Sequence, residues 1–270
     1  MNAVIDEYRV IAYNTARTSD NKIHDDAVAK TYGFGGGLVP GVDVYAYMTQ
    51  PAVKRWGLDW LTRGLAEAKF LKPVYDGKEA IVQAKQENTA DGGERLSVTV
   101  TSGGVLCATG RFGLPVAETD DTAAVAIDAA PLPVDRPPAS AASLPTAALL
   151  GTYVARFDDS VAPVYLQDVR ESLPIYGDQA LAHPGYVARF GNWVLRENVV
   201  LGPWIHVASE IRNMRPIAIN SDLAARARVA DGYERKGHKF TVLDIQLLAD
   251  DLPAAEIRHT AIYEPRRRAG

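Results

Sequence analysis

The sequence contains the same order of predicted helices and strands twice, and this repeat limits the folds that the chain can adopt. In the first half, a glycine-rich turn (33–41) precedes a run with helical spacing of apolar residues, and segments with alternating apolar residues follow. The second half returns to the same order, and Lys72-Pro73 and Arg215-Pro216 fall at the same place, between helix and strands. A long helix laid across an antiparallel sheet hides one sheet face, and two such units hide their remaining edges by pairing. The repeat therefore predicts an α+β fold of two units, each a long helix wrapped by an antiparallel β-sheet.

The boundaries of the two units follow from a change of composition. Residues 117–145 are rich in alanine, proline and aspartate and show no periodicity, which is typical of a linker. We therefore expect an N-terminal unit at 1–116 and a C-terminal unit at 146–270. In the first helix, Pro51 either kinks the helix or begins the next one.

Composition excludes several classes of function. The net charge of -4 and the pI of about 5.8 argue against nucleic-acid binding, which needs a basic stripe. No apolar run has membrane-spanning length, and the N-terminal residues lack the basic and apolar regions of a signal peptide. The single cysteine, Cys107, lies in a strand-like apolar run and is expected to be buried. These features favour a cytoplasmic protein without a membrane partner.

Residues whose side chains could take part in catalysis or binding are concentrated in the segment 19–60. His24 stands among Asp20, Asn21, Asp25 and Asp26, just before the glycine-rich turn. A histidine beside aspartates near a helix start is often a capping and solvation arrangement, so capping is the alternative to catalysis. His206, His238 and His259 are scattered, and no cysteine pair or metal-binding motif occurs, so we expect no metal and no cofactor.

The order DNKIHDD, GLVPG, an apolar helix and FLKPVYDGKEA resembles the MaoC-like hydratase/dehydratase family, of the (R)-specific enoyl-CoA hydratase type. The similarity covers 13–80 well and the second half in outline. It implies a double hotdog fold and activity on acyl thioesters in fatty acid metabolism. The substrate would be an acyl-CoA, and the chain would form a homodimer, or its halves a pseudo-dimer.

The resemblance also implies roles for particular residues. Asn21 and His24 match the family's D-x-N-P-(aliphatic)-H pattern, Ser19 occupies its aspartate position, and Asp20 is displaced by one residue. His24 would act as base and acid, Asn21 would position it, and Asp20 would assist. Gly41 matches the residue whose backbone N–H receives the thioester oxygen, and an amide at a helix N-terminus is suited to that charge.

Further residues are expected near the substrate. The predicted substrate-binding residues are Gly37, Val39, Thr49 and Trp204, with core packing as the alternative role of Trp204. Basic residues that could meet the anionic CoA are Lys54, Arg55, Arg63, Lys69 and Lys72.

The second half offers an alternative catalytic pair. Asp178 and His183 stand five residues apart, which is the family's full aspartate-to-histidine spacing, but Ala180 occupies the asparagine position. The sequence His-Pro-Gly is equally consistent with the end of a turn. Either half could therefore hold the active site.

The function expected from these features is hydration or dehydration of 2-enoyl/3-hydroxyacyl thioesters. One alternative is an acyl-CoA thioesterase, because one fold hosts several reactions. Another is a non-catalytic acyl-thioester-binding subunit, for which Ser19 at the aspartate position is the main argument.

Overall fold

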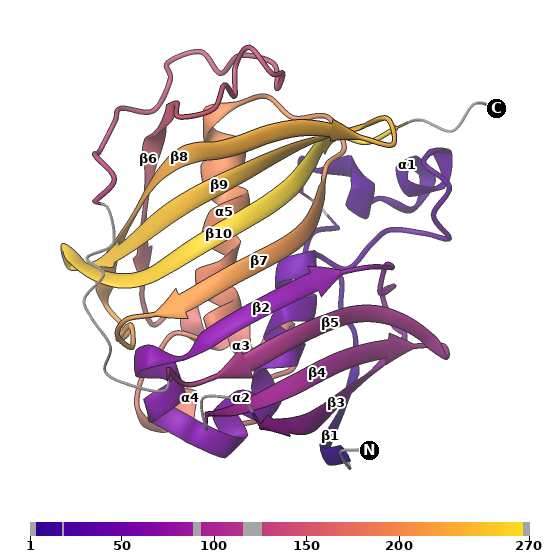
Figure 1. Cartoon of the computed structure of the whole chain (residues 1–270), viewed down its shortest axis with the longest axis vertical. Helices are drawn as coiled ribbons and strands as arrows, with labels where there is room; N and C mark the ends of the chain where they lie inside the picture. Colours follow the sequence, from indigo (N-terminus) through magenta and orange to yellow (C-terminus); the bar gives the residue numbers. More distant parts are fainter. Residues whose placement is uncertain (1–3, 18, 89–92, 116–125, 267–270) are drawn as a thin grey trace.

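The computed structural model describes residues 4–17, 19–88, 93–115 and 126–266. Its strands form one sheet in the order β1-β3-β4-β5-β2-β7-β10-β9-β8-β6, with every pairing antiparallel (Figure 1). The strands are β1 (Val4–Ile11), β2 (Leu65–Phe70), β3 (Glu79–Asn88), β4 (Glu94–Ser102), β5 (Val105–Gly113), β6 (Leu149–Phe157), β7 (Ile205–Asn213), β8 (Ser221–Arg235), β9 (His238–Ala249) and β10 (Leu252–Glu264). The helices are η1 (Lys22–His24), α1 (Asp26–Thr31), α2 (Gly41–Arg63), α3 (Ala162–Asp168), α4 (Ile175–Asp178) and α5 (Pro184–Asn198).

The two halves of the chain each supply five consecutive strands of this sheet and one long helix. They join where β2 pairs with β7, with Leu65 opposite Arg212 and Lys69 opposite Ala208. Helices α2 and α5 lie side by side on one face of the sheet, and Figure 1 shows both behind it. The predicted α+β class and the duplicated helix-and-sheet unit are confirmed.

The repeat is most exact at the entrance to each long helix. The Val39 N–H donates to the Val74 carbonyl at 2.9 Å, and the Ala182 N–H donates to the Ile217 carbonyl at 2.8 Å. Each acceptor directly follows one of the Lys-Pro and Arg-Pro pairs, which therefore occupy equivalent places, as predicted. The N-caps that follow, Pro40 and His183, are equivalent as well.

Helix α2 is interrupted later than the sequence suggested. Pro51 lies inside the helix, and the non-helical residue is Gly57, with φ 54° and ψ -131°. That conformation is accessible to glycine and strained for residues with a Cβ. Gly57, rather than Pro51, therefore divides α2.

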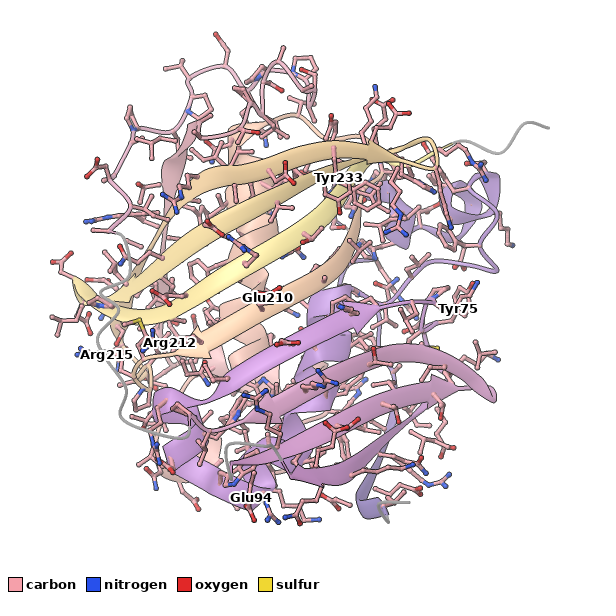
Figure 2. The ribbon with its side chains drawn as sticks, viewed as in Figure 1. Tyr75, Glu94, Glu210, Arg212, Arg215 and Tyr233 are labelled. Carbon is pink, nitrogen blue, oxygen red and sulfur yellow. The ribbon has the colours of Figure 1, made fainter. Side chains whose placement is uncertain are left out.

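The core lies between the helices and the covered face of the sheet. Leu96, Val98 and Val100 of β4 are buried there, which confirms the predicted alternation. The opposite face carries charged side chains, including Glu210 and Arg212 near the joint of the halves (Figure 2). The sheet thus has one face packed on the helices and one polar face.

The segment between the halves has no helix or strand in its described part, 126–148. It is anchored to the second half, since the Val200 N–H donates to the Pro137 carbonyl at 2.8 Å. Residues 117–125 of the predicted linker lie outside the described residues, so the proposed unit boundaries remain a prediction. Strand β6 was not anticipated from the sequence. No helix in the described part of the chain is long and apolar enough to span a membrane.

Candidate active site

The protonation state of His24 is set by a backbone contact. Its Nδ1 lies 2.6 Å from the Leu38 carbonyl oxygen, which can only accept, so Nδ1 carries the proton and Nε2 presents a lone pair. Burial lowers the pKa of His24, although the Leu38 hydrogen bond and the charge of Asp43 act in the opposite direction. His24 is therefore a neutral imidazole at neutral pH, and Nε2 is its basic nitrogen.

Asn21 connects His24 to the other half of the chain. Its Oδ1 accepts from the Ile23 N–H at 3.3 Å, which caps η1, and from the Trp204 N–H at 3.2 Å. Its Nδ2 donates to the Trp204 carbonyl at 3.0 Å and lies 3.3 Å from His24 Nε2. All polar groups of Asn21 are thus engaged, and the predicted positioning role has a geometric basis.

The glycine-rich turn packs against the backbone of His24. A Cβ at Gly37 would lie 2.1 Å from the His24 carbonyl oxygen, and the Gly37 N–H donates to Asp26 Oδ1 at 2.7 Å. Asp25 caps α1 by accepting from Ala27 and Val28. Tyr75, labelled in Figure 2, accepts from the Gly35 N–H at 2.9 Å. Asp25 therefore has the capping role that was the alternative to catalysis, and Asp26 and Gly37 hold the turn together.

His24 lines three cavities: one at the glycine-rich turn, which Gly35 and Gly37 also line, and two that share further residues with each other. The polar cavity, of about 500 Å³, is lined by polar side chains that include Thr15, Ser19, Asp20, Arg136, Arg189 and Arg196. The apolar cavity, of about 220 Å³, is lined by Ile23, Phe34, Val39, Val44, Phe70 and Val74, among others. The residues that line both are Asn21, His24, Pro40, Asn192 and Trp204. We call this set the junction.

Gly41 is the first residue of α2 and lines the apolar cavity. Its N–H has no acceptor within the helix, because the first N–H groups of a helix lack one. A Cβ at Gly41 would lie 2.8 Å from Nδ1 of His206, a residue of β7. Gly41 therefore matches the predicted place of an oxyanion donor, and the need for glycine comes from a histidine of the other half.

His206 itself was not selected as a site residue from the sequence. Its Nε2 lies 3.0 Å from the Ala208 carbonyl and 2.8 Å from Ser209 Oγ, and its ring stacks on that of His259 with centroids 4.3 Å apart. Burial lowers the pKa of His206 well below its ordinary value, and the neighbouring His259 lowers it further. Both rings are thus neutral packing elements, with His206 against Gly41 of α2 and His259 against Gly191 of α5.

No carboxylate among the described residues forms a hydrogen bond to His24. Ser19 lines the polar cavity, and Asp20 lies exposed at its rim. The fully buried carboxylate of Asp43 accepts instead from Thr15 Oγ1 at 2.6 Å and from Arg189 Nη2 at 2.9 Å. Any role of Asp20 therefore requires water or substrate between it and His24.

The structure does not bring the alternative pair together. His183 is 1% exposed, its Nε2 lies 2.9 Å from Glu171 Oε2, and its Nδ1 accepts from the Gly185 N–H at 3.0 Å. Asp178 is exposed at the end of α4. His183 lines neither cavity, whereas His24 lines both, and the place of His183 is equivalent to Pro40 rather than to His24. The geometry favours His24.

The predicted substrate-binding residues divide into two groups. Val39 lines the apolar cavity and Trp204 lines both cavities, whereas Gly37 and Thr49 line neither. Thr49 is fully buried and donates to the Ala46 carbonyl of its own helix at 2.8 Å, so its hydroxyl is turned away from them. The sequence reasoning missed Asn192, although the repeat could have found it: Thr49 and Asn192 each stand nine residues after the N-cap of their helix.

The basic residues expected at CoA are mostly engaged elsewhere. Lys54, Arg55 and Arg63 form ion pairs with Asp6, Glu94 and Asp59, respectively. Lys72 lines the apolar cavity, and the arginines of the polar cavity were not anticipated.

Cys107 is buried, as predicted, and burial raises the pKa of its thiol. Within the described ranges, no group of three or more histidine, cysteine, aspartate or glutamate side chains could hold a metal ion.

Comparison with known proteins bears on the fold. The sequence matches no protein-family model and no curated protein. A solved structure described as a MaoC-like dehydratase aligns at 13% identity and a TM-score of 0.64, covering 97% of this chain and 98% of its own. A Mycobacterium tuberculosis protein described as having a double hotdog fold aligns at 12% identity and a TM-score of 0.64, covering 96% of each chain.

A third solved structure, from Novosphingobium aromaticivorans and provisionally described as a thioesterase, aligns at 12% identity and a TM-score of 0.54. The alignment covers 84% of this chain and 88% of the other. Identities this low show a shared fold and leave the reaction open. The chain has the double hotdog fold of structures described as MaoC-like dehydratases, which confirms at the level of the fold the resemblance found in the sequence.

Proposed function

We propose that the chain is a cytoplasmic hydratase/dehydratase of 2-enoyl/3-hydroxyacyl thioesters, with an acyl-CoA as substrate. The observation that supports it is the junction, where the unprotonated Nε2 of His24 meets a polar and an apolar cavity and Gly41 begins a helix close by. An acyl thioester combines a polar carrier with an apolar chain, and the adjoining cavities offer both environments.

The proposed chemistry assigns each step to a group of the chain. In hydration, His24 Nε2 takes a proton from water as the oxygen forms a bond to C3 of the enoyl thioester. The electron pair of the double bond moves to C2 and the thioester oxygen, where the Gly41 N–H stabilises the negative charge. The proton held by His24 then passes to C2, so the base is regenerated and the sum is addition of water. Asn21 keeps the ring in place throughout.

The test is a hydration assay with crotonyl-CoA and longer enoyl-CoA esters. We expect the His24→Gln substitution to lower kcat/KM by about 100-fold or more, because general acid–base catalysis contributes at least that factor. His183→Gln, at a site that lines neither cavity, is the control, and its kcat/KM should stay within about threefold if the variant folds. Equal activity of wild type and His24→Gln would exclude the assignment.

Two other functions keep specific support. Thioester hydrolysis is compatible with the fold, and release of free thiol from acyl-CoA without hydration would establish it. A non-catalytic binding subunit is favoured by the lack of a carboxylate hydrogen-bonded to His24 among the described residues. Ligand-induced thermal stabilisation without turnover would support that function, and turnover by the purified chain would exclude it.

A further inference from the structure

We infer that Asn192, a residue of α5 in the second half, binds the oxygen at C3 of the acyl thioester: the water before addition and the hydroxyl group after it. This inference rests on the proposed function, because it assigns a partner to the 3-hydroxyacyl form of the substrate. It places one side chain of each half at the reacting carbon, with His24 from the first half and Asn192 from the second.

The position of Asn192 is the first argument. It belongs to the junction, so it lines both cavities, as His24 does. The other polar side chain of the junction, Asn21, has its amide fully occupied by Ile23, Trp204 and His24. Asn192 and Trp204 are the junction residues whose side-chain polar groups make no hydrogen bond that the described part of the chain accounts for, and of these only the Asn192 amide can both donate and accept.

The second argument is an unsatisfied atom. Asn192 Oδ1 is buried without a hydrogen-bond partner among the described residues. Burying such an atom unpaired costs about 1–3 kcal/mol, so a native protein retains one mainly where it has a use. Of the buried unpaired atoms in the described part of the chain, those from residues lining the two cavities are Asn192 Oδ1 and His206 Nδ1, and the latter faces Gly41.

The third argument comes from the internal repeat. Thr49 occupies the position equivalent to Asn192 in α2, but its hydroxyl is satisfied by its own helix and lines neither cavity. The same helix position thus lines neither cavity in one half and lines both cavities in the other. An amide both donates and accepts, so it can bind a water or hydroxyl that also gives a proton to His24 Nε2.

The experiment measures binding of a matched ligand pair, butyryl-CoA and (3R)- or (3S)-3-hydroxybutyryl-CoA. A His24→Gln background prevents turnover during the measurement. With Asn192 present, we expect one hydroxy stereoisomer to bind about 3- to 10-fold more tightly than butyryl-CoA, which is the usual net effect of one hydrogen bond. In Asn192→Leu that preference should vanish, while the affinity for butyryl-CoA changes less than about twofold. Thr49→Val is the matched control and should keep the preference.

The outcomes separate this inference from the proposed function. A hydroxyl preference that survives in Asn192→Leu overturns the inference, even if the wild type hydrates crotonyl-CoA. A preference that depends on Asn192 supports the inference as a binding role, even if the wild type shows no turnover. If thermal unfolding shows that Asn192→Leu does not fold, the same binding measurement is made with Asn192→Ala and Asn192→Ser. Serine retains a donor and an acceptor, and we expect it to recover part of the preference that alanine loses.

Discussion

The contact between Gly41 and His206 shows how one residue of each half fixes the site. A Cβ at position 41 would come within 2.8 Å of His206 Nδ1 and 3.2 Å of its Cγ. The movement of the His206 ring is restricted, because it is stacked on His259, with centroids 4.3 Å apart, and packs against the tilted ring of Phe70, at 4.6 Å. The start of α2 is thus held by the ring of a β7 residue.

We therefore predict that Gly41→Ala lowers the free energy of unfolding by about 1–3 kcal/mol, the usual cost of overpacking. Denaturant unfolding of Gly41→Ala, His206→Ala and the double variant would measure the coupling between the residues. The double variant should be less destabilised than the sum of the single variants, since the methyl group then meets no ring. Strict additivity would contradict the proposed clash.

The pH dependence of the reaction tests the state of His24. Burial holds its pKa below the ordinary value of 6.5, so the folded protein keeps the basic, neutral form to lower pH than a free histidine would. We expect kcat/KM for hydration to be level above about pH 6.5 and to fall only at lower pH, as Nε2 becomes protonated. A pH–rate profile of the wild type measures this. A midpoint clearly above 6.5 would mean that another group controls the reaction.

The sequence predicted part of this site. Asn21, His24 and Gly41 were chosen from one local pattern, and the structure gathers them because that pattern is a cap, a turn and a helix start in direct succession. Asn192 and His206 were missed because their proximity depends on the pairing of β2 with β7 and of α2 with α5. No local spacing encodes such contacts. Comparing equivalent positions of the repeat could still have found Asn192.

At the level of single elements, α2 depends on the backbone of Gly57. Its φ of 54° and ψ of -131° favour glycine, while the nearest atom to an added Cβ is Ile175 Cδ1, at 3.9 Å. The cost of a substitution there would thus be conformational rather than steric. The sequence placed the interruption at Pro51, since proline is the stronger helix breaker in general.

Gly57→Ala should lower the free energy of unfolding by about 1–3 kcal/mol through this backbone strain. Gly177→Ala, in α4, is the matched control: a Cβ there meets nothing within 4 Å and its φ is not in the positive range. The control should be neutral or slightly stabilising, because alanine reduces the entropy of the unfolded chain. Thermal unfolding of both variants gives the comparison, and equal effects would remove the special role of Gly57.

A second element-scale prediction concerns the ion pair between the long helices. Asp43 of α2 is fully buried, and Arg189 of α5 donates to it at 2.9 Å and lies over the Tyr165 ring at 4.4 Å. Asp43→Asn leaves the arginine charge without its counterion in a mostly buried place, so we expect a loss of about 3 kcal/mol. Denaturant unfolding should show a smaller loss for Asp43→Asn combined with Arg189→Met, because no unpaired charge remains.

At the scale of the whole molecule, the sequence predicted the duplication and the pairing of two helix-and-sheet units. It did not predict that the units would share one continuous sheet, since the register of β2 on β7 joins residues far apart in the sequence, from Lys69 and Ala208, 139 positions apart, to Leu65 and Arg212, 147 positions apart. Strand β6 at the far edge was also missed. The junction is a product of this joint, because Asn21 and His24 come from one unit and Asn192 and Trp204 from the other.

The shared sheet leads to a prediction about unfolding. The halves meet through the β2–β7 ladder, the contact of α2 with α5, and the Asn21–Trp204 hydrogen bonds. Unfolding of either half would break all of these contacts. We expect one cooperative thermal transition. Two variants that each retain a single tryptophan, Trp60 in the first half or Trp193 in the second, should report coincident fluorescence transitions. Separate midpoints would show that the units fold independently and that the joint adds little stability. In that case the junction would form only by docking of two finished units, and substitutions at Asn21 would weaken ligand binding without changing either midpoint.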